Sequence, residues 1–365
     1  MGIEHIHSNH PEEIEGFGEG EDAYWDDYPI DTLLIRNETR TVFDVLRRIE
    51  KGSFVMNPDF QRDFIWPDDK QSKLIESVLM RIPLPVLYLA EDEKGRMVVV
   101  DGLQRLSTFQ RFVNNGLQLK LPHQAGLNKK TFKDLSPKLQ NRVEDCNLIL
   151  YIIDAKVPEK ARLDIFERVN SGVPLSRQQM RNCIYMGQAT RFLRTEATTF
   201  LFREATGDSL TYSNMRDREC VNRFCAFQLL ALEDYKGDMD DFLAKCLKKM
   251  NTLSPDELEK LSTQFRTSLK NNLIVFGKHA FRKSVSGQQE RSVFNASLWD
   301  VMSTGLSRYP EHVVEARAET LRATFVSLLT DEKFNSAITL GTSQVKKVGY
   351  RFEAANNLFR EVFGA

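Results

Sequence analysis

The sequence predicts an α+β protein: a small mixed β-sheet with helices, followed by an all-helical part. Three observations predict this. Short apolar runs alternate with helical patterns up to Ile153, strand signals become scarce after Pro158, and long helical patterns continue from there. Since 365 residues exceed what one typical core needs, we expect two domains. We place an acidic flexible leader at 1–28, a first domain at 29–185 and a helical domain at 186–365.

In chain order, the sequence predicts helices at 41–49, 70–82 and 101–114, an extended segment at 54–58, and strands at 87–90, 97–100 and 147–153. The last strand is apolar throughout, so we expect both of its faces to be buried. The second part is predicted to contain helices at 159–170, 177–185, 219–233, 239–250, 255–272, 294–307, 311–329 and 344–363. No apolar run approaches the ~20 residues of a membrane helix, and the start does not resemble a secretory signal, so we expect a cytoplasmic protein without a membrane partner.

The charge is distributed unevenly. Residues 1–31 hold ten of the 51 acidic side chains and no Lys or Arg. The rest of the chain therefore has 41 acidic residues and all 50 Lys and Arg residues, which gives it a net charge of +9. The leader is then either a solvated, mobile tail or a mimic that competes with an anionic partner for a basic surface.

The most informative segment runs from Val98 to Phe109, where a buried strand enters a helix through Asp101 and Gly102. The first N–H groups of such a helix point beyond the strand end and favour an anion. Gly102 has no Cβ and lets an anion approach, Arg105 offers a charge-assisted contact to phosphate, and Ser107 and Thr108 add hydroxyl groups. Alternatively, Asp101 and Gln104 form a capping box and no ligand is needed.

On a helical wheel Arg105 falls inside the apolar arc. A charge on an apolar face needs a partner, because burying it alone costs several kcal/mol. The partner is either an anionic ligand or an internal carboxylate, Asp59 or Asp101.

Two further segments carry candidate residues. Residues 57–66 combine Gln61 and Arg62 with Phe60, Phe64 and Trp66, which suits base stacking and phosphate binding, or simply core anchoring. Residues 166–176 bring Arg168 and Asn170 to the end of a helix, where they either reach into a cleft or belong to a helix exit at Gly172 and a capping box of Ser176 and Gln179.

Together the three segments resemble the N-terminal domain family of GmrSD-type modification-dependent restriction enzymes, whose fold is related to ParB and sulfiredoxin. The family motif D-G-Q-Q-R-L-T-T-L is met by residues 101–109, P-x-F-Q-R by 58–62, and F-x-R-x-N-x-G-x-P-L by 166–175. Leu103 replaces the first Gln of the hallmark, which removes one hydrogen-bonding side chain. No HNH-type surroundings are found around His123, His279 or His312, so the resemblance is to a stand-alone member without that nuclease domain.

The resemblance implies binding and hydrolysis of a nucleoside triphosphate (GTP, ATP or CTP), coupled to sensing or cutting foreign, modified DNA in bacterial antiphage defence. Asp101, Gln104 and Arg105 would surround the phosphates, faced by Gln61 and Arg62, and Asp101 could hold Mg²⁺. Two alternatives stay open. One is a nucleotide-gated switch with little turnover that acts on an effector protein or a homodimer, and the other is a nuclease that uses the same Asp101 pocket.

The helical part carries two groups of basic residues. If they meet in space they form a duplex-binding face, and otherwise they are a solvated charged surface. Their members are Lys278, Arg282, Lys283, Arg291, Lys346, Lys347 and Arg351.

Overall fold

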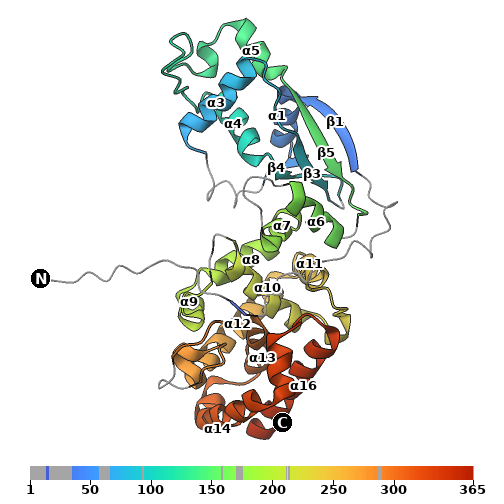
Figure 1. Cartoon of the computed structure of the whole chain (residues 1–365), viewed down its shortest axis with the longest axis vertical. Helices are drawn as coiled ribbons and strands as arrows, with labels where there is room; N and C mark the ends of the chain where they lie inside the picture. Colours follow the sequence, from blue (N-terminus) through green and yellow to red (C-terminus); the bar gives the residue numbers. More distant parts are fainter. Residues whose placement is uncertain are drawn as a thin grey trace, which may run out of the picture. The chain divides into compact units, whose positions relative to one another are not determined.

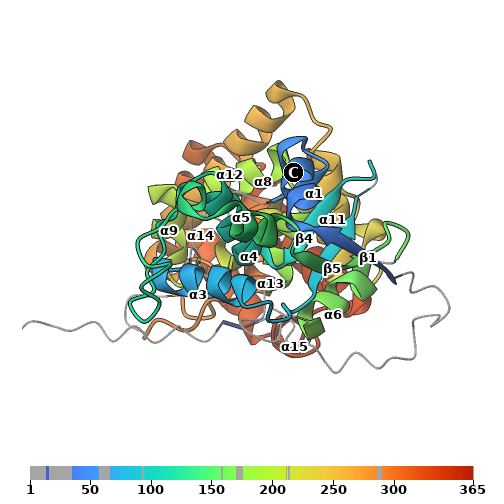
Figure 2. The same ribbon diagram turned by 90° about the horizontal axis from the view of Figure 1, so that it is seen from above.

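The first part of the chain is built around a five-stranded mixed sheet. The computed structural model describes residues 14–15, 35–56, 66–92, 94–157, 159–169, 176–210, 212, 214–285 and 290–364. The strands are β1 (Ile35–Thr41), β2 (Phe54–Val55), β3 (Leu87–Glu91), β4 (Met97–Asp101) and β5 (Asn147–Ile153). They follow the order β1-β5-β3-β4-β2, and β1, β5 and β4 can be traced in Figure 1 and Figure 2.

Neighbouring strands are both parallel and antiparallel. β1 pairs antiparallel with β5, in a register that places Ile35 opposite Ile153, and β3 pairs antiparallel with β4 as the predicted hairpin. β5 with β3, and β4 with β2, run parallel. The small mixed sheet and the α+β class are therefore confirmed.

β1 lies in a stretch for which the sequence predicts no strand. Its residues, IRNETRT, lack an apolar alternation. Instead, Arg36 pairs with Glu91 at 2.6 Å, and Arg40 pairs with Asp44 at 2.8 Å. Pairing with β5 along its whole length and the ion pair to Glu91, 55 residues away, stabilise the strand, and a local sequence pattern contains neither.

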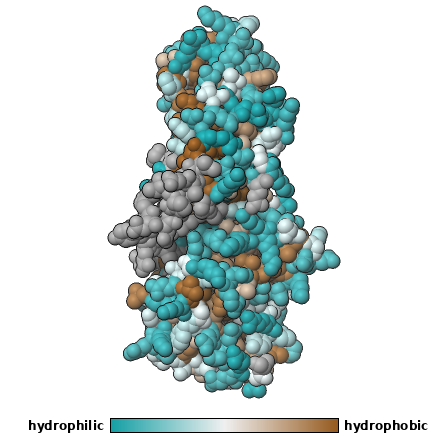
Figure 3. Space-filling model, turned by 90° about the vertical axis from the view of Figure 1, so that its right-hand side faces the viewer, coloured by the Kyte–Doolittle hydropathy of each residue, from teal (hydrophilic) through white to brown (hydrophobic). Residues whose placement is uncertain are grey.

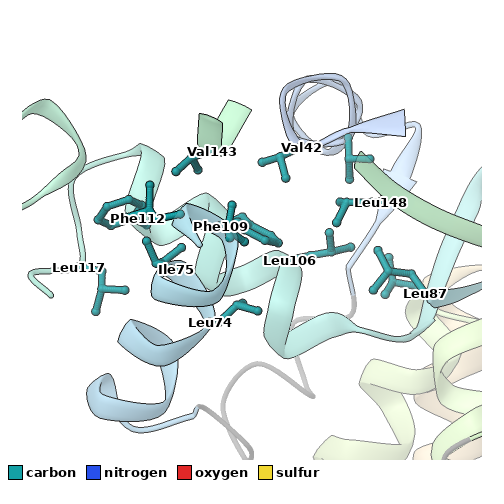
Figure 4. Packing of buried hydrophobic residues seen from close by; sticks show 14 of the residues in the cluster. Val42, Leu74, Ile75, Leu87, Leu106, Phe109, Phe112, Leu117, Val143 and Leu148 are labelled. Carbon is teal, nitrogen blue, oxygen red and sulfur yellow. The ribbon is translucent and has the colours of Figure 1, made fainter. Parts of the chain in front are cut away.

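Four helices cover one face of the sheet. They are α1 (Val42–Glu50), α3 (Asp68–Leu79), α4 (Leu103–Val113) and α5 (Pro137–Glu144). A short 3-10 helix, η3 (Phe132–Asp134), lies between α4 and α5 in the chain. Figure 4 shows their apolar side chains meeting those of the strands, with Phe109 and Phe112 of α4 at the centre and fully buried. Truncating a buried Phe to Ala typically costs ~3–5 kcal/mol, so α4 is firmly held in place.

The expectation that β5 is buried on both faces is wrong. Leu148, Leu150 and Ile152 point into the helical layer and are buried, whereas Ile149 on the opposite face is 45% exposed. The helices α6 (Glu159–Val169) and α7 (Arg177–Ile184) contact β4. The strand is therefore apolar along its length but covered on one face near its start.

The chain divides into two compact units. Of the described residues, 35–186 belong to the first unit, and 187–364 together with 14–15 near the start of the chain belong to the second. The second is helical, and its elements are α8 (Gln188–Ala197), α9 (Phe200–Thr206), α10 (Arg216–Leu229), η4 (Leu232–Asp234), α11 (Met239–Met250), α12 (Pro255–Phe276), η5 (Gly277–His279), α13 (Ala296–Leu306), α14 (Glu311–Thr330), α15 (Glu332–Thr339) and α16 (Val345–Phe363). The short helices α8, α9 and α15 had not been expected, nor had α5 in the first unit.

Trp299 of α13 is at the centre of the helical unit. Its ring is fully buried among the rings of Phe202, Phe265 and Phe281, and its Nε1–H donates to the carbonyl of Cys220 at 2.8 Å. Such a ring gains both apolar burial and a satisfied polar group. Among the described residues, no helix is long and apolar enough to cross a membrane. The face seen in Figure 3 is mostly hydrophilic, with hydrophobic side chains in small separate patches.

Two members of the expected basic surface are instead buried. Arg351 and Arg223 both bind the fully buried carboxylate of Asp300, at 2.8 and 2.7 Å. Arg282 is 2% exposed and donates to the carbonyls of Thr206 and Ser292. The prediction of a solvent-facing role is therefore wrong for Arg282 and Arg351, because partners distant in the sequence neutralise or satisfy their guanidinium groups.

Candidate functional site

The β4–α4 turn is built on a glycine that no other residue can replace without strain. β4 ends at Asp101, and Gly102, the residue before α4, has a φ of 100°. A Cβ at this position would lie 1.9 Å from Cδ2 of Leu87. L-residues disfavour this φ, and the side chain of Leu87 occupies the space. The sequence predicted that this space admits an anion to the backbone, but Leu87 fills it on the Cβ side.

The start of α4 carries no side-chain cap. The expected capping box of Asp101 and Gln104 is wrong, because the N-cap residue is Gly102 and Asp101 belongs to β4. The side-chain oxygen of Gln104 instead accepts from the backbone N–H of Trp66 at 2.9 Å. Within the described residues, no acceptor binds the N–H groups of Leu103, Gln104 and Arg105. These donors and the helix dipole favour a negative group at this position.

Arg105 is buried and bound internally. Its Nη2 donates to Asp101 Oδ2 at 2.8 Å and to the carbonyl of Val86 at 2.9 Å, and its Nη1 donates to the carbonyl of Pro85. Burial lowers the pKa of the guanidinium from its ordinary value, an effect that Asp101 opposes. Of the two alternatives from the sequence, the structure contains the internal ion pair, and its partner is Asp101. Arg105 thereby joins the segment before β3 to the β4–α4 turn.

A hollow of about 340 Å³, surrounded by polar residues, lies between α3 and α4 next to the turn. Its lining residues are Gln71, Gln104, Ser107, Thr108, Gln110, Arg111 and Asn114. Ser107 Oγ is buried without a hydrogen-bond partner in the described structure, whereas Thr108 Oγ1 donates to the carbonyl of Gln104 at 2.7 Å. The structure therefore brings Gln104, Ser107 and Thr108, all predicted as site residues, to one surface.

Sequence reasoning missed Arg111 and Gln71. Arg111 Nη1 binds Asp68 at 2.7 Å and Gln71 Oε1 at 3.2 Å, which holds the guanidinium at the edge of the hollow. Arg111 lies seven residues after Gln104 and four after Ser107, so a search for polar residues at helical spacing could have found it. Gln71 comes from α3, and only the packing of α3 on α4 brings it to the hollow.

Several predicted site residues are not part of this cluster. Gln61, Arg62 and Asn170 lie outside the described residues, as does Asp59, the other candidate partner of Arg105. Arg168 is exposed near the end of α6. The capping box of Ser176 and Gln179 at the start of α7 is confirmed, with hydrogen bonds of 3.2 and 2.7 Å.

Trp66 is half-buried against the core of the first unit, as expected for an anchoring aromatic residue. Its ring lies 4.4 Å from Lys70 Nζ, a cation–π contact, while its backbone carbonyl accepts from Gln71 at 2.5 Å. Trp66 therefore connects Gln104 with Gln71 on the two helices that line the hollow.

Asp101 is the residue that could hold a divalent cation at the turn. Its side chain is 33% exposed, and Oδ1 has no hydrogen bond in the described structure, since only Oδ2 binds Arg105. No group of three His, Cys, Asp or Glu with metal-binding geometry occurs among the described residues. One carboxylate fits Mg²⁺ when phosphate oxygens complete the coordination, but it does not make an all-protein metal cage.

Part of the chain matches a known protein family. Residues 42–186, which contain the turn and the hollow, match the family model of the GmrSD restriction endonuclease, N-terminal domain. No curated protein matches the chain. The match relates this segment to restriction systems, and it ends at the same residue as the first compact unit.

Proposed function

Residues 42–186 form a domain of the GmrSD restriction endonuclease N-terminal family, and from this we propose that the β4–α4 turn binds and hydrolyses a nucleoside triphosphate in a defence module directed at foreign DNA. The single observation that carries the proposal is the start of α4, where three successive backbone N–H groups, from Leu103 to Arg105, have no acceptor in the described structure. Orphan donors at a helix start match the oxygens of a phosphoryl group.

The hollow on α4 supports the same proposal, because it offers space and hydrogen-bonding groups beside the turn. Its volume of about 340 Å³ is within the ~300–1,000 Å³ typical of small-molecule sites. Ser107 Oγ is buried and lacks a partner there. A ribose or base hydroxyl, carbonyl or amine that bonded this oxygen would satisfy a group that is otherwise unfavourable to bury.

The residues have distinct roles in this proposal. Asp101 would hold Mg²⁺, which when bound supplies positive charge that stabilises the transferred phosphoryl group. Arg105 orients the Asp101 carboxylate through the 2.8 Å ion pair instead of contacting phosphate with a free guanidinium. Gln104 contributes its backbone N–H, since its side-chain oxygen binds Trp66. Gln61, Arg62, Arg168 and Asn170 remain in the proposed nucleotide site on the strength of the family motifs alone.

A second candidate is a nucleotide-gated switch with little turnover. It is favoured by the single carboxylate at the turn, since a phosphoryl-transfer site usually positions its attacking water with a further polar group. At the turn, the side-chain oxygen of Gln104 is bound to the N–H of Trp66, which leaves its amide nitrogen, a donor that cannot accept a proton from the attacking water.

Parallel titration calorimetry with ATP, GTP and CTP in the presence of Mg²⁺ tests the proposal, with phosphate release and plasmid cleavage measured separately. We expect Asp101→Asn to retain the Arg105 contact and to lose most phosphate release. The matched control is Asp154→Asn, which removes a carboxylate 3.8 Å from Arg36 in the same unit. Binding without release would support the switch, and cleavage that depends on Asp101 would support the nuclease alternative. If none of the three nucleotides binds, or if both variants release phosphate as the unmodified chain does, the assignment of Asp101 is wrong.

A further inference from the structure

Glu15 of the acidic leader is docked on the helical unit. Its backbone N–H donates to the carbonyl of Phe294 at 2.9 Å, and its carbonyl accepts from the N–H of Ala296 at 2.8 Å. The side-chain Oε2 accepts from Asn295 Nδ2 at 3.0 Å and pairs with Lys283 Nζ at 2.8 Å. Both ends of the residue are therefore bound, the backbone as a parallel β-bridge and the carboxylate as an ion pair.

The docking position favours a negatively charged segment. Ala296 is the first residue of α13, so the leader carbonyl binds an N–H that the helix cannot satisfy itself. Asn295 is fully buried and is held by its own contacts, accepting from Leu298 N–H and donating to the carbonyl of Ile338. Its amide is thus fixed in the orientation that donates to the Glu15 carboxylate.

One lysine from each of the two basic groups predicted from the sequence lies beside this position. Lys283 Nζ donates to Thr339 Oγ1 at 2.9 Å, and Lys347 Nζ donates to the carbonyl of Leu340 at 2.5 Å. Two lysines far apart in the sequence therefore bind adjacent residues at the end of α15. Leu340 is 66% exposed, which places this junction at the surface. We call Lys283, Lys346 and Lys347 the lysine surface.

The position of the lysines in α16 also points to an anionic partner. Lys346 and Lys347 lie in the first turn of α16, which contains no acidic residue. Positive side chains at a helix N-terminus are disfavoured by the helix dipole, and a bound anion relieves this repulsion. Glu15, bound to Lys283, brings one such negative charge next to the junction.

We propose that the lysine surface binds the phosphate backbone of nucleic acid, and that the acidic leader competes with it by docking Glu15 on Lys283. The leader is suited to this role because it holds ten acidic residues and no Lys or Arg within residues 1–31, while the rest of the chain has a net positive charge. The ion pair is partly exposed, with 27% and 35% of the two side chains accessible, so salt screens it and a polyanion can displace it. The proposal concerns the helical unit and does not depend on nucleotide binding at the β4–α4 turn.

Fluorescence anisotropy with a short labelled DNA duplex tests the competition on the full chain. We expect Glu15→Gln to bind the duplex about three- to tenfold more tightly than the unmodified chain at low salt, with a smaller difference at high salt. The matched control is Glu311→Gln, which removes an exposed carboxylate 2.9 Å from Lys270 on the same unit. Combining Glu15→Gln with Lys283→Met should abolish the gain. Equal affinities for Glu15→Gln and Glu311→Gln would show that only net charge matters and would overturn the proposal.

Zero-length carbodiimide cross-linking gives an independent readout. A carboxylate and an amine 2.8 Å apart should be converted into an amide that links the Glu15 and Lys283 peptides, detectable by mass spectrometry. Lys283→Arg keeps the positive charge but offers no amine, so it is the control in which the link must disappear. Excess duplex should reduce the yield of the link severalfold. A missing link in the unmodified chain would contradict the docking, and a yield unaffected by duplex would contradict the competition.

Discussion

Replacing Arg105 by Ala should destabilise the first unit markedly, even without any ligand. The substitution removes three hydrogen bonds, one to the Asp101 carboxylate and two to the carbonyls of Pro85 and Val86. Breaking a fully buried ion pair typically costs ~3–5 kcal/mol, and the partial exposure of Asp101 places the expected loss near the lower end, at about 3 kcal/mol. For a unit of this size, about 2–4 °C per kcal/mol gives a fall in Tm of about 6–12 °C.

Urea unfolding followed by circular dichroism, with calorimetric Tm values, measures this loss. Asp101→Asn serves as the matched variant, because it keeps an oxygen acceptor for Arg105 while removing the negative charge. Its loss should be smaller, about 1 kcal/mol, since both carbonyl contacts of Arg105 remain. The double variant should show non-additive losses, as expected for two residues in direct contact. A change below about 1 kcal/mol in Arg105→Ala would refute the buried, internally bonded guanidinium.

Three further perturbations follow from the same kind of reasoning. Gly102→Ala should destabilise the first unit by about 2 kcal/mol or more, because the added Cβ would lie 1.9 Å from Cδ2 of Leu87 and the φ of 100° is unfavourable for Ala. Urea unfolding measures this loss, and an unchanged unfolding curve would contradict the geometry of the turn. Asp300→Asn should cost the helical unit about 3–5 kcal/mol, because two buried guanidinium groups lose their counter-charge, and a loss within about 0.5 kcal/mol would show that these charges are compensated otherwise. Burial raises the pKa of Tyr235 from 10 to about 12, so the folded state retains its proton where the unfolded state loses it, and stability should fall as pH rises from about 10 to 12. Tyr235→Phe should flatten that part of the stability profile, measured by urea melts at successive pH values, and a slope that persists unchanged would assign it to other groups.

Much of the candidate site was predictable from the sequence because its signals are local. The three valines before Asp101 predict a buried strand, and the spacing of Leu106 and Phe109 predicts the buried side of α4. The helical wheel also placed Arg105 among these apolar residues, and the structure confirms that it is buried. The helical wheel could not predict that the guanidinium of Arg105 also binds the backbone carbonyls of Pro85 and Val86, because these residues lie about twenty positions earlier in the chain.

The environment of the charged side chains, in contrast, could not be predicted from the sequence. Arg282 and Arg351 appear in the sequence as members of basic groups, yet both are buried, and Arg351 binds Asp300, 51 residues away. Lys283 from the same group stays partly exposed and binds Glu15 of the leader. A count of charges along the chain cannot separate these cases, since the electrostatic environment of each group depends on residues brought close only by folding.

From the sequence alone came the α+β class, the buried faces of β4 and α4 and the motifs of the restriction-related family, because each depends on residues within a few turns of one another. Only the tertiary structure decided that Asp300 pairs with Arg223 and Arg351, that Leu87 occupies the space beside Gly102, and that Gln71 shares a hollow with α4. The physical reason is that hydrophobic periodicity is read over short segments, whereas ion pairing and close packing are set by distances in space between segments that are remote in the chain.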